Sequence, residues 1–150
     1  MKLKIPPALV FLSFGAFMYL LDRFLPFGTF DFFGREYLIG ALLVVAVGIG
    51  LLSLFQFYRA KTSVDPMQPS KASSLVTKGL YKYSRNPMYL AMLLLLLALG
   101  LKLGNAFNTI TAALFVSYMN RFQIGPEEEM LTKSFGKAYE QYCTQVRRWF

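Results

Sequence analysis

Long apolar runs separated by short polar segments are the dominant pattern of this chain. The runs cover residues 6–25, 37–58, 87–103 and 106–123, approximately. A helix rises about 1.5 Å per residue, so about 20 apolar residues span the ~30 Å hydrocarbon core of a bilayer. The pattern predicts an all-α membrane protein with about four transmembrane helices. Only the Gly104-Asn105 turn separates the last two runs, which predicts that helices three and four form an antiparallel hairpin.

The pattern changes after Pro126, where apolar residues recur at spacings of three and four. They include Leu131, Phe135, Tyr139 and Tyr142, with charged residues between them. This periodicity predicts a C-terminal amphipathic helix on the cytoplasmic membrane surface or against the helix bundle, with a bend marked by Gly136. Residues 26–36 are rich in phenylalanine and predict an outer loop in the membrane interface, whereas residues 59–74 predict a polar, water-exposed connector.

Composition supports a single integral membrane domain covering residues 1–150. The chain is 55% hydrophobic and only 16% charged, with a mean hydropathy of +0.43. It contains no histidine and one cysteine, which excludes histidine-based acid–base catalysis and an internal disulfide framework, and we expect no metal site. The net charge of +8 comes from basic residues that flank apolar runs. We therefore expect contact with anionic lipid headgroups and no nucleic-acid partner.

The distribution of lysine and arginine predicts the orientation in the membrane. With four spans, thirteen of these residues fall on one side: Lys2, Lys4, Arg59, Lys61, Lys71, Lys78, Lys82, Arg85, Arg121, Lys133, Lys137, Arg147 and Arg148. Arg23, Arg35 and Lys102 fall on the other. The positive-inside rule then places both termini in the cytoplasm, with the inner (cytoplasmic) membrane as the expected location. The loop before residue 89 and the C-terminal helix lie on the same side and can meet.

Two polar clusters at this membrane face are the candidates for chemistry. The first comprises Tyr81, Tyr83, Arg85, Asn86 and Tyr89, and the second is the Glu127–Glu129 run after Pro126. Unpaired polar groups are costly where a chain enters the bilayer. Each residue also has a purely structural explanation. Interfacial tyrosines anchor helices, Arg85 obeys the charge rule, Asn86-Pro87 suits a helix cap, and the glutamates suit a helix dipole.

Both clusters resemble the signature of the isoprenylcysteine carboxyl methyltransferase and phospholipid methyltransferase superfamily. The string Gly79-Leu80-Tyr81-Lys82-Tyr83-Ser84-Arg85-Asn86-Pro87-Met88-Tyr89 is similar to its Gly-x-Tyr-x-x-x-Arg-His/Asn-Pro-x-Tyr pattern. The family ending is matched by Glu127-Glu128, Leu131, Phe135-Gly136, Tyr139, Tyr142, Val146 and Arg148-Trp149. The resemblance covers residues 75–150. Asn86 stands where many members have histidine.

The resemblance implies methyl transfer from S-adenosyl-L-methionine to a lipophilic acceptor, either an isoprenylcysteine-like carboxylate or a lipid. It implies Arg85 and Glu128 as catalytic residues. The cofactor-binding residues that it implies are Lys78, Gly79, Tyr81, Tyr83, Arg85, Asn86, Pro87, Tyr89, Glu127 and Glu128. Two alternatives remain open at this point: an NADPH-dependent enzyme resembling the sterol reductases, and a non-catalytic membrane scaffold.

Overall fold

The computed structural model describes residues 5–59 and 75–150. These residues form six α-helices and two shorter helical segments, with no β-strand in either described range. The α-helices are α1 (Pro7–Phe24), α2 (Arg35–Arg59), α3 (Pro87–Leu103), α4 (Phe107–Met119), α5 (Gly125–Phe135) and α6 (Lys137–Gln145). The short segments are η2 (Gly79–Lys82), a 3₁₀ helix, and η3 (Asn120–Ile124), a π-helix. The predicted all-α class is confirmed, while most of the predicted polar connector, residues 60–74, lies outside the described residues.

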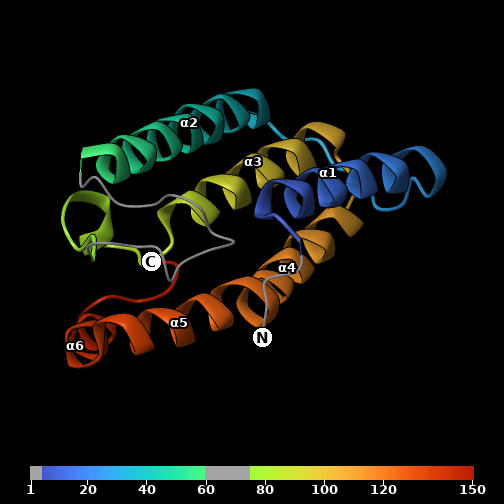
Figure 1. Ribbon diagram of the computed structural model, residues 1–150. Coiled ribbons are helices and arrows are strands. Elements are labelled where there is room, and N and C mark those ends of the chain that lie inside the picture. The colour runs from blue at the N-terminus through green and yellow to red at the C-terminus, as the bar shows by residue number, and fades with distance from the viewer. Residues whose placement is uncertain (1–4, 60–74) are drawn as a thin grey trace.

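Helix α3 is the centre of the arrangement (Figure 1). It packs against α2 on one side and against α1 and α4 on the other. Helices α5 and α6 extend from α4 along the lower edge of Figure 1, and the chain end returns from α6 to the start of α3. This return brings residues far apart in the sequence to one place.

Two helices are long and apolar enough to cross a membrane. They are α1, with 18 residues, and α2, with 25. Helix α3 is apolar but has 17 residues, and α4 has 13. The structure thus provides two candidate membrane spans, and the expectation of four spans remains a prediction.

The helical path does not stop between the fourth apolar run and Pro126, as the sequence pattern had suggested. It continues from α4 through η3 into α5, and the backbone N–H of Gly125 donates to the carbonyl of Asn120 five residues earlier. A π-turn adds a residue to the helical turn and rotates the side chains that follow it. Glu127 and Glu128 therefore lie inside a continuous helical path rather than at a free helix start.

The predicted C-terminal amphipathic helix is divided in two at Gly136. This residue has a φ of +51°, a left-handed region that glycine tolerates better than other residues. The bend predicted there is confirmed. It turns α6 so that Tyr139 and Tyr142 become buried against Tyr81 of η2.

Buried side chains form two clusters. The larger one fills the space between α1, α3 and α4 and includes Met18, Leu96, Phe115 and Met119. The smaller one comprises Tyr81, Tyr139, Tyr142 and Val146. Since the smaller cluster joins η2 to α6, it fixes the segment before α3 against the C-terminal part of the chain.

Candidate functional site

The two polar clusters meet where α3 and α5 begin. Nη2 of Arg85 lies 3.0 Å from Oε1 of Glu128. The Arg85 side chain is 12% exposed and the Glu128 side chain 18% exposed. Two opposite charges so withdrawn from solvent depend on each other, because leaving either one unpaired would be costly.

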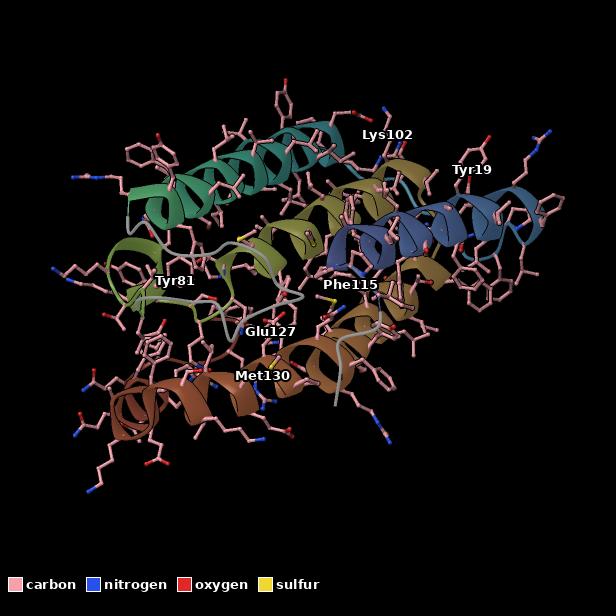
Figure 2. All side chains as sticks on the ribbon, in the orientation of Figure 1. Tyr19, Tyr81, Lys102, Phe115, Glu127 and Met130 are labelled. Carbon is pink, nitrogen blue, oxygen red and sulfur yellow. The ribbon has the colours of Figure 1, made fainter. Side chains whose placement is uncertain are left out.

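A second contact joins α3 to α5. The Tyr89 hydroxyl in α3 donates a short hydrogen bond to Oε1 of Glu127 in α5. Burial raises the pKa of Glu127 to about 8, an effect that the Tyr89 hydrogen bond opposes and the neighbouring Glu128 charge reinforces. Figure 2 labels Glu127 on the side of α5 that faces the start of α3. At neutral pH, Glu127 is therefore largely protonated.

The last residues of the chain cross over this cluster, and we call Val146–Trp149 the C-terminal strap. The Arg85 backbone N–H donates to the Arg147 carbonyl at 2.9 Å. The carbonyl of Arg148 accepts hydrogen bonds from Asn86 Nδ2 at 3.0 Å and Ser84 Oγ at 3.2 Å. The strap thus holds the turn before α3 through its own backbone.

Two side chains of the strap contact the other half of the site. The Arg148 guanidinium donates to Glu128 from Nη2 to Oε2 at 2.6 Å and from Nε to Oε1 at 3.0 Å. The indole N–H of Trp149 donates to Oδ1 of Asn120, in the π-turn, at 3.0 Å. The strap therefore ties the turn before α3 to the junction of α4 and α5.

Three tyrosines support the site from η2 and α6. The Tyr142 hydroxyl donates to the carbonyl of Tyr81 at 2.6 Å, and the Tyr81 ring packs edge-on against Phe57 of α2. Burial raises the pKa of Tyr81, Tyr139 and Tyr142 above the usual range of a phenol. These hydroxyls are therefore neutral at physiological pH and act as hydrogen-bonding and packing groups.

Gly79 opens η2 with a φ of +65°, and a Cβ at this position would collide with the side-chain amide of Gln56. Oε1 of Gln56 accepts the backbone N–H of Leu80 at 3.2 Å, so α2 holds the start of the signature segment through this amide. Glycine at position 79 of the signature is thus explained locally. The backbone has a positive φ there, and the Gln56 side chain leaves no room for a Cβ atom.

We expect Gly79→Ala to destabilise the protein by about 1–2 kcal/mol, because the left-handed conformation is unfavourable for alanine. It should also displace Gln56. Thermal unfolding in detergent measures the effect. Gly40→Ala is the matched control, since that glycine lies within α2 with nothing within 4 Å of its Cβ position. An equal melting temperature for both variants would contradict this account of Gly79.

The structure brings four of the ten predicted site residues into one contact cluster and leaves two others exposed. Arg85, Tyr89, Glu127 and Glu128 form the cluster described above. Pro87 begins α3. Lys78 and Tyr83, in contrast, have exposed side chains, with Tyr83 76% exposed. The cofactor-binding role predicted for these two residues, as for the other eight, stays a prediction.

Asn86 occupies the N-cap position of α3, but its side chain makes no capping hydrogen bond. It donates to the strap instead, so the simple helix-cap explanation does not account for this side chain. No role in the site was assigned from the sequence to Arg148, Trp149 or Asn120. The Arg148-Trp149 pair was the available signal, because it forms the end of the family pattern.

Comparison with known proteins identifies the family of this chain. The family model described as phospholipid methyltransferase matches residues 35–138, which include both clusters and the helices α2 to α5. The match confirms the resemblance found in the two signature segments.

Individual relatives include named enzymes. Over 107 residues the chain is 32% identical to a protein-S-isoprenylcysteine O-methyltransferase of Schizosaccharomyces pombe, a match covering 65% of this chain and 45% of the relative. It is 28% identical over 106 residues to a methanethiol S-methyltransferase of Pseudomonas deceptionensis, covering 69% of this chain and 39% of the relative. An uncharacterized protein of Haemophilus influenzae is 45% identical over 62 residues, covering 41% of this chain and 98% of that protein. The chain thus spans about half or less of the length of the Schizosaccharomyces and Pseudomonas methyltransferases. Because the family model matches residues 35–138, the chain belongs to the phospholipid methyltransferase family.

Proposed function

We propose that this protein transfers a methyl group from S-adenosylmethionine to a lipophilic acceptor at the cytoplasmic face of a membrane. The observation that carries the proposal is the Arg85–Glu128 ion pair, with its 3.0 Å contact, beside the Tyr89–Glu127 hydrogen bond. These contacts join the two signature segments, which lie about forty residues apart in the sequence. The printed names of the relatives support methyl transfer as the reaction class.

The residues of the cluster suit a cofactor that carries a carboxylate, an ammonium group and a sulfonium. Nε of Arg85 is buried and has no hydrogen-bond partner in the part of the chain that the structure describes. This N–H is suited to an incoming carboxylate oxygen. Glu127 and Glu128 suit an ammonium group or ribose hydroxyls, and the tyrosine rings suit adenine or a cationic centre.

S-adenosylmethionine supplies a methyl group activated by a positive sulfur. The work left to the protein is to align two reactants and exclude water, which lowers the barrier by several kcal/mol. Arg85 and Glu128 provide fixed charges for this alignment, and Tyr89 orients Glu127. An acceptor carboxylate has no proton to lose, so a chain without histidine suffices for this reaction.

The acceptor and the membrane arrangement belong to the same proposal. An isoprenylcysteine-like carboxylate or a lipid would approach through the bilayer, in which we place α1 to α4 as four spans with both termini in the cytoplasm. The side chains of α2 that are exposed in the structure include Val44, Leu51 and Phe55, which suit contact with lipid tails.

The direct test is calorimetric titration of the purified protein in detergent. We expect S-adenosylhomocysteine to bind and to compete with S-adenosylmethionine. NADPH should not compete with either ligand. The titration separates a methyltransferase from an enzyme resembling the sterol reductases.

Binding of NADPH without binding of either adenosyl compound would overturn the proposal in favour of the reductase alternative. Absence of binding by all three would favour the non-catalytic scaffold. Mass spectrometry of lipids and small molecules from cells with and without the protein would then identify the acceptor, as a species differing by one methyl group.

A further inference from the structure

We infer that Arg148 is a positioning residue: by holding Glu128, it keeps the Arg85 guanidinium available for a carboxylate of the bound ligand. The inference rests on the proposed function and deepens it. It assigns a role to the C-terminal strap, which lies beyond the residues assigned from the signature.

The geometry shows an unequal sharing of Glu128. Arg148 takes both carboxylate oxygens, with contacts of 2.6 Å to Oε2 and 3.0 Å to Oε1. The contact of Arg85 with Glu128 is the ion pair from Nη2 to Oε1 at 3.0 Å. A guanidinium has five N–H donors in a planar fork, so Arg85 retains donors that Glu128 does not use.

One of these remaining donors is identified. Nε of Arg85 is buried and has no hydrogen-bond partner within residues 5–59 and 75–150. A buried N–H without a partner is costly and marks a place where a ligand oxygen would be stabilised. Without Arg148, the Arg85 guanidinium could rotate to bind both carboxylate oxygens of Glu128. Its Nε–H would then no longer be available to the ligand.

The local charge favours an anion. Arg85 and Arg148 contribute two positive charges against the one charge of Glu128, because burial keeps Glu127 largely protonated at neutral pH. A carboxylate would balance the remaining positive charge. It belongs either to the amino-acid part of the cofactor or to the acceptor.

Anchoring of the strap does not require the Arg148 guanidinium. The carbonyls of Arg147 and Arg148 and the indole of Trp149 already attach the strap at both ends. The Arg148 side chain is 43% exposed, far more than Arg85 at 12%. The Arg148–Glu128 contact is therefore additional to what holds the strap in place, and its effect falls on Glu128 and Arg85.

The test compares Arg148→Ala with Arg147→Ala, which removes the same charge from the neighbouring exposed side chain. Calorimetry measures the binding affinity of each variant for two pairs of ligands. In each pair, one ligand carries a carboxylate and the other lacks it. One pair is S-adenosylhomocysteine and 5′-methylthioadenosine, which lacks the amino-acid part. The other pair is S-farnesyl-N-acetylcysteine and its carboxamide. Emission of Trp149, the single tryptophan of the chain, reports whether the strap stays in place.

We expect Arg148→Ala to weaken binding of the carboxylate member of one pair by about tenfold, with the other member unchanged and Trp149 emission retained. The affected pair identifies the source of the carboxylate. Arg148→Lys should lose most of the same affinity, because an ammonium does not hold both oxygens in one plane.

Equal affinities of the Arg148→Ala and Arg147→Ala variants for every ligand that the wild type binds would overturn the inference while leaving the proposed function intact. Equally weakened binding of both members of each pair would also overturn the inference. A shifted Trp149 emission in Arg148→Ala and Arg148→Lys would do the same, because either result indicates that Arg148 has a structural role only. If the wild-type protein bound neither S-adenosylmethionine nor S-adenosylhomocysteine, the proposed function would be refuted, and this inference with it.

Discussion

Arg85→Ala and Glu128→Gln are each expected to lower methyl transfer by about a hundredfold or more while the protein still folds and inserts. Removing one preorganised polar group from an active site typically costs about 2.7–4 kcal/mol of transition-state stabilisation, and Arg85 and Glu128 are held as such a pair at 3.0 Å. About 2.7 kcal/mol already corresponds to a hundredfold change in rate. The measurement is the turnover rate with S-adenosylmethionine per amount of folded protein. Size-exclusion chromatography gives the amount of folded protein for each variant.

The control variants change exposed charges near the site. Lys133→Ala and Lys137→Ala remove exposed charges from α5 and α6 and should change turnover little. Arg85→Lys should be nearly as poor as Arg85→Ala, because a point charge does not reproduce the guanidinium fork. The double variant Arg85→Ala/Glu128→Gln should lose less than the sum of the single effects, since the two groups act as a pair.

Near-normal turnover of the Arg85 and Glu128 single variants would return these residues to structural roles. Arg85 would then be a membrane-orientation signal and Glu128 a partner for Arg148. The site of methyl transfer would have to lie elsewhere in the chain.

The second large effect concerns pH. Burial raises the pKa of Glu127 from about 4.5 to about 8, so the folded protein holds a proton that the unfolded chain releases between these values. Folding stability should therefore decline as pH rises from about 4.5 to about 8, by up to about 5 kcal/mol. Glu127→Gln removes the ionisable group, and its melting temperature in detergent should lack this part of the decline.

Thermal melts from pH 5 to pH 9 measure the difference between wild type and variant. Glu129→Gln is the matched control, because that glutamate lies two residues away on α5 with an exposed side chain. It should keep the wild-type pH dependence. Parallel pH curves for wild type and Glu127→Gln would show that Glu127 is not protonated in the folded protein at neutral pH.

Local features of the sequence determined much of the fold. The apolar runs gave α1, α2 and α3 to within two residues, and Pro87 marked the start of α3 as found. Gly136 marked the bend between α5 and α6. These predictions succeed because helix length, proline and glycine act through neighbouring residues, without reference to the rest of the molecule.

Local patterns were insufficient where the helix continues against expectation. The sequence pattern ended the fourth helix near Gln123 and began another at Pro126, because proline usually opens a helix. In the structure the helix instead continues through the π-turn of η3 into α5, which contains Pro126 in its first turn. Trp149, from the distant chain end, donates a hydrogen bond to Asn120 in this π-turn. A contact across 29 residues leaves no periodic trace in the sequence.

The sequence by itself determined the helical class, the two polar clusters and, through the signature, the family. It also placed Arg85 and Glu128 among the candidates for one site. Only the tertiary structure decided that these two side chains pair, that Glu127 binds Tyr89, and that Arg148 shares Glu128. The physical reason is that side chains of α3, α5 and the strap meet through packing of η2 against α6, and such meetings depend on distances in space rather than on spacing along the chain.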